Sequence, residues 1–322
     1  MKNKISIICP CYNEFDNINL FYERIKNIFN ENIKQYDYEI IFVDDDSKDN
    51  SKLLLENISQ NDPNCKVLFN SINYGVHKST FNAIKYATGI FLVPMMPVDM
   101  QDDPDLLIKF VKKIEEGFDV VYGIKKNRDE NFFLKLIRNT YYKFLTKISN
   151  TNIPPYVGEY QLLRENIYKE LLNFNDYYPY TRGIIATLTS NSIGVDYIWK
   201  KRIKGKSKTN FLKLIDIGIN GIISYSNFPI RFFTFFGILL SILSMIFIII
   251  QFITHFFIYG RMSTPGISTL IIVTFFFSGV QFLFLGILGE YISAIHSQTR
   301  KPKNNVILRK TLNIKEINKF IT

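Results

Sequence analysis

The stretch that decides the fold of this chain is Glu39-Ile-Ile-Phe-Val-Asp-Asp-Asp-Ser-Lys-Asp49. After Glu39, four residues form a short apolar run rich in β-branched side chains, which predicts a buried strand. Three consecutive carboxylates follow at once, beginning with Asp44. Ligands of open α/β sheets bind beyond the carboxyl ends of the strands, so a polar cluster in this place marks a candidate site.

The same pattern of a buried run followed by polar residues recurs along the first part of the chain. Segments with apolar residues at helical spacing, such as 17–29 and 104–116, separate the runs. Strands that alternate with helices predict βαβ units and a parallel sheet whose polar segments meet at one edge. The other expected strands are 5–8, 66–69, 90–93 and 119–122, and their polar segments are Pro10–Glu14, Asn73–Gly75 and Pro97–Asp103.

Charge is distributed unevenly along the 322 residues, which carry a formal net charge of +10. Charged residues are frequent in the first two thirds and almost vanish between Phe232 and Ile292. The basic balance does not indicate nucleic-acid binding, because acidic residues gather at the candidate site. The excess lysines and arginines lie instead near the apolar segments, where anionic lipid headgroups and phosphates would be found.

Two long apolar segments predict membrane-spanning helices. Residues 232–258 and 267–292 each exceed the ~20 residues that cross a hydrocarbon core. Arg231 precedes the first segment and a basic run, Arg300–Lys303, follows the second, so the positive-inside rule places both ends in the cytoplasm. The apolar run before Pro10 is too short for a signal peptide. We therefore expect a multi-pass protein of the inner (plasma) membrane with a cytoplasmic N-terminal domain.

Two amphipathic segments precede the apolar ones. Residues 131–149 and 210–225 have apolar side chains at helical spacing, interleaved in the first segment with lysine and arginine. They predict helices that either pack on the core or lie in the membrane interface, and their closeness to the expected spans favours the interface. The expected division is a cytoplasmic domain over 1–228 that includes these helices, two transmembrane helices over 229–295 and a basic cytoplasmic tail over 296–322.

Asp99 follows the fourth expected strand and is the main candidate metal ligand. A carboxylate there can hold a hard divalent cation together with substrate phosphates. The alternative is an acidic turn before the next helix, with Asp102 or Asp103 as its N-cap residue. Asp44 and Asp45 also have two interpretations: a solvated loop with an N-cap, or groups that hydrogen-bond a base and a ribose.

Several short motifs follow one another in order along the chain. They are Pro10-x-Tyr-Asn-Glu14, Phe42-Val-Asp-Asp-x-Ser-Lys-Asp49, Asn73-Tyr-Gly75, Val98-Asp-Met-Gln-Asp102, Asp119-Val-Val-Tyr-Gly123, Val157-Gly-Glu-Tyr160, Arg182-Gly183, Gly205-Lys-Ser-Lys208 and Gly286-Ile-Leu-Gly-Glu-Tyr291. In this order they resemble the inverting family 2 glycosyltransferases, and in particular the polyprenyl-phosphate type. That type includes bactoprenol glucosyltransferases and dolichol-phosphate mannose synthases. The resemblance implies an α/β GT-A (Rossmann-like) domain that uses a nucleotide sugar.

The resemblance also implies roles for single residues. Asp99 and Gln101 would bind Mg²⁺ or Mn²⁺ and the diphosphate, and Asp99, Glu159 and Arg202 would be catalytic. Two positions depart from the family pattern: Pro97 replaces the first carboxylate of Asp-x-Asp, and Gly158-Glu-Tyr160 replaces Gly-Asp-Phe. The implied donor-binding residues are Pro10, Tyr12, Glu14, Asp44, Asp45, Lys78, Asp99, Gln101, Ser207 and Lys208.

The chemistry of the acceptor can be argued without the family. Transfer to a sugar hydroxyl needs a general base, whereas a phosphate monoester with a second pKa near ~6 is largely a dianion at neutral pH. Such an acceptor needs cations that position it, and Arg138 and Arg202 are the expected ones. We therefore expect a metal-dependent transferase that moves a hexose, with UDP-glucose as first choice, to polyprenyl (undecaprenyl) phosphate for cell-surface glycan modification.

Two other functions stay open at the level of sequence. Processive polysaccharide synthases share the fold but carry a Gln-x-x-Arg-Trp motif, whereas Gln161-Leu-Leu-Arg164 is followed here by Glu165. A non-catalytic membrane scaffold that kept the fold is the second, prompted by Pro97. The sequence does not identify the sugar and is compatible with a homo-oligomer.

Overall fold

The computed structural model describes residues 2–126, 140, 157–174, 176, 179–200, 228–254, 267–299 and 306–314. The chain divides into two compact units, which we describe separately. The first combines residues 1–147, 151–217 and 301–322, and the second combines 148–150 and 218–300. Apart from Thr140, the predicted interface helices over 131–149 and 210–225 lie outside the described residues.

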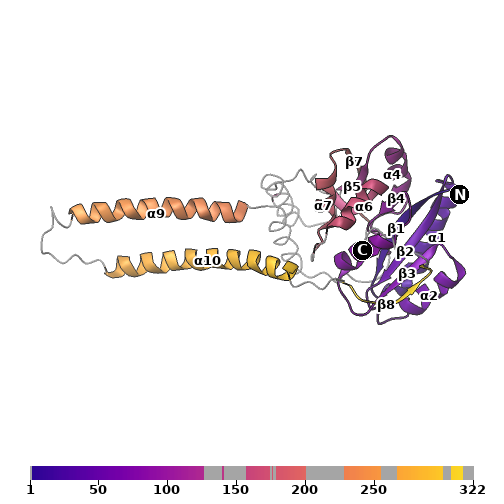
Figure 1. Cartoon of the computed structure of the whole chain (residues 1–322), viewed down its shortest axis with the longest axis horizontal. Coiled ribbons are helices and arrows are strands. Elements are labelled where there is room, and N and C mark those ends of the chain that lie inside the picture. The colour runs from indigo at the N-terminus through magenta and orange to yellow at the C-terminus, as the bar shows by residue number, and fades with distance from the viewer. Residues whose placement is uncertain are drawn as a thin grey trace. The chain divides into compact units, whose positions relative to one another are not determined.

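The first unit is built on an eight-stranded sheet with the order β7-β5-β6-β4-β1-β2-β3-β8 (Figure 1). The strands are β1 (Asn3–Cys11), β2 (Tyr36–Asp44), β3 (Cys65–Asn70), β4 (Phe91–Val93), β5 (Val120–Lys126), β6 (Val157–Arg164), β7 (Ser192–Ile198) and β8 (Leu308–Leu312). Strands β4, β1, β2 and β3 run parallel, as the alternation of strands and helices predicts. The sheet is nevertheless mixed, because β6 is antiparallel to β4 and β5, and β8 is antiparallel to β3.

Helices cover both faces of this sheet. They are α1 (Phe15–Glu31), α2 (Ser51–Asn61), α3 (Val76–Ala83), the 3₁₀ turn η1 (Ile84–Tyr86), α4 (Leu106–Glu115), α6 (Glu165–Asn173) and α7 (Thr181–Leu188). On one face Ile7 and Phe42 belong to a core with α1, α2 and α4, and on the other Ile8 and Val43 belong to a core with α3, α6 and α7. Since successive residues of a strand point to opposite faces, a strand covered on both sides reads as a continuous apolar run.

A buried ion pair fixes the edge of the sheet opposite the candidate site. Glu39 on β2 is 3% exposed, and its carboxylate lies 2.7 Å from Lys66 Nζ on β3. The carboxylate also accepts hydrogen bonds from Ser6 Oγ at 2.6 Å and from Thr88 N at 2.9 Å. Burial alone would raise the pKa of Glu39, but Lys66 and these hydrogen bonds hold it below its ordinary value. The network ties β1, β2 and β3 to the turn that leads into β4.

The sequence after the apolar helices returns to the first unit and forms β8. The strand pairs with β3 from Leu312 opposite Val67 to Leu308 opposite Asn70. We expected residues 296–322 to be a separate basic tail, but residues 308–312 are the last strand of the sheet. Leu308 and Leu312 pack against the two cores, while the three residues between them are exposed. This exposure explains why charge dominates the sequence of the segment.

The second unit contains two apolar helices, α9 (Phe228–Thr254) and α10 (Ile267–Thr299). They lie side by side (Figure 1), and the ring centroids of Phe233 and Phe284 are 5.8 Å apart. Among the described residues, one stretch is long and apolar enough to cross a membrane, Phe276–Thr299 of α10, and the apolar stretch of α9 is shorter. Length and composition thus support one candidate span, and the two-helix transmembrane hairpin stays a prediction.

Candidate active site

Two loops at the carboxyl edge of the sheet are joined by hydrogen bonds. Pro10–Glu14 ends β1, and Asp44–Asp49 ends β2. Asn13 has a left-handed backbone with φ of 53°, a conformation that asparagine adopts more readily than most residues. Its N–H donates to Ser47 Oγ at 2.9 Å, and its Oδ1 accepts from Lys48 N at 2.7 Å. The loop that contains the predicted donor-binding residues Pro10, Tyr12 and Glu14 is therefore held against the second loop.

Asp45 organises the loop that follows β3. The residue is 5% exposed, and its carboxylate accepts hydrogen bonds from Tyr74 N and Gly75 N, both at 2.9 Å. It also accepts from Asn70 Nδ2 at 2.7 Å and from Ser79 Oγ at 2.9 Å. Gly75 has a φ of 87°, which favours glycine because a side chain would strain this backbone. The protein itself thus supplies four donors to Asp45.

The neighbouring Asp44 has an acceptor atom that the described residues leave unused. Its Oδ2 accepts a hydrogen bond from Ser47 N at 3.2 Å, while its Oδ1 is buried without a partner in the described part of the chain. Burial raises the pKa of this carboxyl. Asp46 differs, because hydrogen bonds from Lys48 at 2.5 Å and Lys52 at 3.0 Å lower its pKa to about 2. Of the three carboxylates, Asp44 is the one with a buried oxygen that accepts no hydrogen bond from the described residues.

Asp99 begins a tight turn beyond β4. Met100 has a left-handed backbone with φ of 62°, which is uncommon for a residue with a long side chain. Gln101 N donates a hydrogen bond to Asp99 Oδ1 at 3.1 Å, and Asp99 is 5% exposed. The turn thus brings together the two residues predicted to bind metal. Backbone strain of this kind is retained mainly where function requires it.

The next carboxylate, Asp102, is neutralised by the protein. Lys125 Nζ on β5 lies 3.0 Å from its Oδ1, and the Tyr197 hydroxyl on β7 donates a hydrogen bond to it. Lys200, just beyond β7, donates its N–H to Gln101 O at 3.0 Å. Asp102 therefore anchors the end of β7 beside the Asp99 turn.

The capping alternative for this acidic segment holds in part, for Asp103. Helix α4 begins at Leu106, and its N-cap residue is Asp105 rather than Asp102 or Asp103. Leu106 N donates to Asp103 O at 3.0 Å, so a backbone turn around Pro104 separates the acidic segment from the helix. Asp103 Oδ1 accepts a hydrogen bond from Asp105 N at 3.3 Å, so the Asp103 carboxylate caps this turn, two residues before the assigned N-cap.

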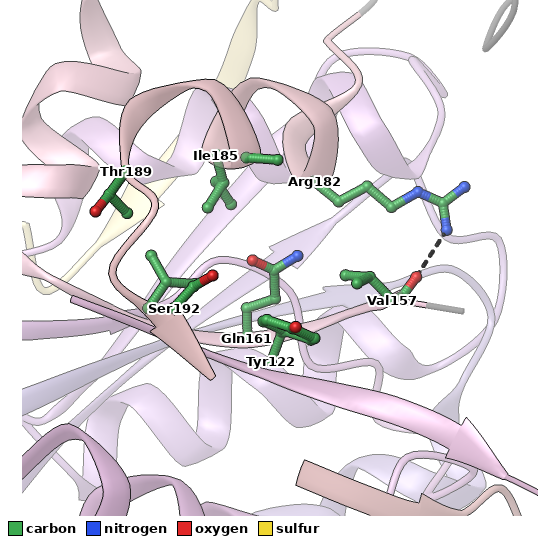
Figure 2. A pocket seen from close by; sticks show the side chains of 9 residues that line it. Tyr122, Val157, Gln161, Arg182, Ile185, Thr189 and Ser192 are labelled. Carbon is green, nitrogen blue, oxygen red and sulfur yellow. Dashed lines mark hydrogen bonds between the residues drawn. The ribbon is translucent and has the colours of Figure 1, made fainter. Parts of the chain in front are cut away.

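Glu159 on β6 pairs with Arg182 on α7, so two motifs distant in sequence meet. Arg182 Nε lies 3.4 Å from Glu159 Oε1, and Arg182 Nη1 donates to Val157 O at 3.1 Å. Arg182, Gln161 and Thr189 line a shallow, open concavity, and Figure 2 shows Arg182 at one end of it and Thr189 at the other. Since this concavity does not include the loops after β1, β2 and β4, we place the candidate site at the sheet edge and not within it.

The described residues fit a metal ion that keeps most of its water. No group of three or more His, Cys, Asp or Glu side chains within them is arranged to hold a metal. Asp99 and Gln101 offer one carboxylate and one amide oxygen, so water and substrate phosphates would have to complete the coordination, as is usual for Mg²⁺. Lys78 lies in the first part of α3, after the loop that Asp45 holds. Arg138, Arg202, Ser207 and Lys208 lie outside the described residues.

The sequence did not reveal the residues that hold the carboxylates of the site in place by hydrogen bonds and ion pairs. Asn70 and Ser79 bind Asp45, and Lys125 and Tyr197 bind Asp102. A signal existed only for Asn70, a polar residue at the end of an apolar strand. Ser79 lies 34 positions from its partner and Tyr197 lies 95 positions from its partner, so no local pattern could reveal them.

Comparison with known proteins gives a consistent result. The sequence profile described as Glycosyl transferase family 2 matches residues 6–172, more than half of the chain. "Putative glycosyltransferase CsbB" of Bacillus subtilis is 32% identical, covering 94% of this chain and 91% of that protein. "Bactoprenol glucosyl transferase" of Shigella phage SfX is 29% identical, covering 95% and 100%. Among solved structures, the mannosyltransferase PcManGT from Pyrobaculum calidifontis, in complex with GDP-Man and Mn²⁺, has a TM-score of 0.47 at 14% identity, covering 94% and 89%.

The matched residues 6–172 hold strands β1 to β6 and the loops that form the candidate site. The match confirms the predicted GT-A domain and the predicted class of enzyme, a glycosyltransferase. The matched residues include the parallel strands at the centre of the sheet and the polar edge beyond them, both of which the pattern of apolar runs predicted. The chain belongs to glycosyl transferase family 2.

Proposed function

We propose that this enzyme transfers a sugar from a nucleotide sugar to a polyprenyl phosphate, with inversion at the sugar carbon. One observation carries the proposal: the family motifs after β1, β2, β3 and β4 gather at one sheet edge. Support for the acceptor comes from the relative named bactoprenol glucosyl transferase, which covers 95% of this chain. Undecaprenyl phosphate is the proposed acceptor, and UDP-glucose is the proposed donor.

The donor base is proposed to bind at Asp44. The buried Oδ1 accepts no hydrogen bond from the described residues, and the imide N–H of a uracil or guanine ring would supply one. Asp45 contributes indirectly, because its carboxylate fixes the backbone of the loop at Tyr74 and Gly75. Pro10, Tyr12, Glu14 and Lys78 are proposed to complete the nucleotide site, and Ser207 and Lys208 to close over the diphosphate.

Asp99 and Gln101 are proposed to hold Mg²⁺ or Mn²⁺. When bound, the ion would neutralise the diphosphate and stabilise the departing nucleotide. Because Asp102 forms an ion pair with Lys125, we propose that Asp99 is the one carboxylate of this segment that binds the metal ion. Asp99 therefore has the role that two carboxylates share in the family pattern.

The acceptor phosphate is proposed to act as its own nucleophile. An oxygen of the dianion forms the bond to the sugar carbon while the bond to the nucleoside diphosphate breaks, which inverts that carbon and needs no proton transfer. Arg138 and Arg202 are proposed to position the phosphate. Glu159 Oε1 lies 3.4 Å from Arg182 Nε. Glu159 is proposed to help catalysis by orienting the cations around the acceptor phosphate, and not as a general base.

The membrane is the proposed location of the reaction. A lipid phosphate cannot leave the headgroup layer without exposing its chain, at roughly 0.8 kcal/mol per CH₂. We propose that residues 229–295 cross the inner membrane twice and that the domain over 1–228 works on the cytoplasmic face, with 131–149 and 210–225 in the interface. The candidate span in α10 supports this proposal.

Full-length enzyme in detergent, given undecaprenyl phosphate, Mg²⁺ or Mn²⁺ and a panel of nucleotide sugars, is expected to form a lipid-linked monosaccharide. Mass spectrometry identifies the product, and chelation by EDTA is expected to abolish it. The matched control is undecaprenol, which lacks the phosphate and should not react. A polymer would point to a processive synthase, and no transfer from any donor would contradict the proposed function.

Replacing Asp45 with Asn is expected to raise the KM for the donor about tenfold or more, with a smaller change in kcat. The amide cannot accept from all four donors, and a hydrogen bond to a charged acceptor contributes about 1.5–3 kcal/mol. Asp46→Asn, in the same loop, is the control and should change the donor KM less than threefold, since its carboxylate binds only exposed or half-buried lysines. Equal donor KM values in the two variants would contradict the role of Asp45. Steady-state kinetics measure both.

A further inference from the structure

We propose that the segment after α10 positions the loop that binds the donor nucleotide. Residues 71–75, here named the donor loop, lie between Asp45 on one side and the chain at Ile307 and β8 on the other. The inference rests on the proposed function, since it assigns a task to this loop. It makes the C-terminal segment part of the donor site, although that segment belongs to none of the family motifs and lies beyond the matched residues 6–172.

Ile307, the residue before β8, makes two hydrogen bonds to the donor loop. Its carbonyl accepts from Ser71 N at 2.9 Å, and its N–H donates to the Tyr74 hydroxyl at 3.3 Å. The Tyr74 hydroxyl also lies 3.1 Å from Ser71 Oγ. Both ends of the loop are thus joined to one residue of the C-terminal segment. Neither bond belongs to the regular ladder between β3 and β8, which ends at Asn70 opposite Leu308.

The opposite side of the donor loop is fixed by Asp45. Tyr74, whose hydroxyl accepts a hydrogen bond from Ile307 N, also donates its own backbone N–H to Asp45 at 2.9 Å. Asn70, fully buried at the end of β3, donates to Asp45 as well, and the register of β3 and β8 shifts between Phe69 and Asn70. The loop is therefore clamped between β2 and the C-terminal segment, with Tyr74 bonded to both.

The C-terminal segment is itself anchored at both ends. Val306 is 4% exposed, which fixes the start of the segment. At the far end, Asn313 Nδ2 donates to Ser59 O at 2.6 Å and to Cys65 O at 2.9 Å. A segment held at each end can transmit its position to the loop beside it. A segment that was not anchored could not restrict the donor loop in this way, because the segment would move together with the loop.

The size of the expected effect follows from the number of bonds. A neutral hydrogen bond contributes about 1 kcal/mol, so losing the bond to Tyr74 should weaken donor binding about fivefold. Losing the whole segment should weaken it more strongly, because both Ile307 bonds and the neighbouring strand disappear. The acceptor and the chemical step do not depend on this loop. The clamp therefore predicts a higher donor KM with an unchanged kcat.

The test uses full-length Tyr74→Phe and Ile307→Pro, with Lys310→Met as the control. Lys310 is also on β8, but its partner is Glu56, at 2.7 Å on the exposed side. We expect the donor KM to rise about fivefold in Tyr74→Phe and more in Ile307→Pro, with kcat and the acceptor KM within twofold of the wild type. The control should match the wild type in all three. A variant truncated after Thr299 should regain donor affinity when a peptide of residues 304–314 is added, as strand addition allows.

Hydrogen exchange at Ser71, Tyr74 and Gly75 separates this inference from the proposed function. Ile307→Pro is expected to lose amide protection there, whether or not the enzyme transfers sugar. If the wild type transfers no sugar but protection falls, the proposed function fails and the clamp stands. If transfer is normal while the donor KM and the amide protection in Tyr74→Phe and Ile307→Pro equal those of the wild type, the clamp is refuted and the proposed function stands.

Discussion

Replacing Asp99 with Asn is expected to lower kcat/KM for sugar transfer by about 10³-fold or more at saturating metal. The variant loses the carboxylate that we propose for the metal, and charge stabilisation by such an ion is worth several kcal/mol. The side chain of Pro97 offers no ligand atom, and the two carboxylates that follow in the segment are already paired, Asp102 with Lys125 and Tyr197 and Asp103 with Lys200. Steady-state kinetics with both substrates measure the loss.

Asp105→Asn is the matched control for Asp99→Asn. Asp105 lies six positions further along, and its carboxylate pairs with Arg24 at the surface. We expect it to transfer sugar within about twofold of the wild type, since exposed ion pairs contribute little. Thermal unfolding should show that Asp99→Asn stays folded. Turnover near the wild-type value in Asp99→Asn would refute the proposed metal site.

Replacing Lys66 with Met is expected to lower the free energy of unfolding of the catalytic domain by about 3–5 kcal/mol. The change leaves Glu39 as an uncompensated charge in a position that is 3% exposed. Pulse proteolysis of the full-length protein in urea measures the difference. Lys113→Met is the control, because Lys113 pairs with Glu116 on an exposed helix surface and should cost about 1 kcal/mol or less.

The pH dependence of this difference gives a second measurement. The pKa of Glu39 in the folded protein lies below its ordinary value, so its contribution is present above the unfolded pKa of about 4.3 and is lost as the pH falls through the folded pKa. In Lys66→Met, burial without a cationic partner should raise the pKa of Glu39 instead. The stability difference between the two proteins should therefore shrink on acidification. A difference that is constant from pH 7 to pH 4 would contradict the ion-pair explanation.

The parallel centre of the fold could be predicted because its signal is local. The run over 40–43 is apolar on both faces of β2, as is typical of a strand covered on both sides, and the acidic cluster after it marks the ligand edge. The antiparallel strands could not be placed in the same way. The direction of β6 is set by its antiparallel pairing with β4, which its own sequence does not reveal, and the place of β8 depends on a pairing with β3 that spans most of the chain.

The residue types of the candidate site could be predicted from the sequence, but the different roles of its carboxylates could not. Asp44 and Asp45 are adjacent in sequence and look equivalent, yet Asp45 takes four hydrogen bonds from the protein while Asp44 keeps an oxygen that the described residues leave unused. The difference arises because adjacent side chains at the end of a strand face opposite ways. Only distant residues such as Asn70 and Ser79 decide which carboxylate is occupied by the protein.

The position of β8 has a consequence for the order of events during synthesis. Tyr74 and Ile307 are 233 positions apart, so at ~5–20 residues per second the ribosome needs roughly 10–50 s to supply the last strand after the donor loop has formed. Throughout that interval β3 is an edge strand with unpaired backbone groups, which is a template for pairing with other chains. Both apolar helices are made before the strand that covers this edge. The sheet of the nascent catalytic domain is therefore completed only after both apolar helices have been synthesised.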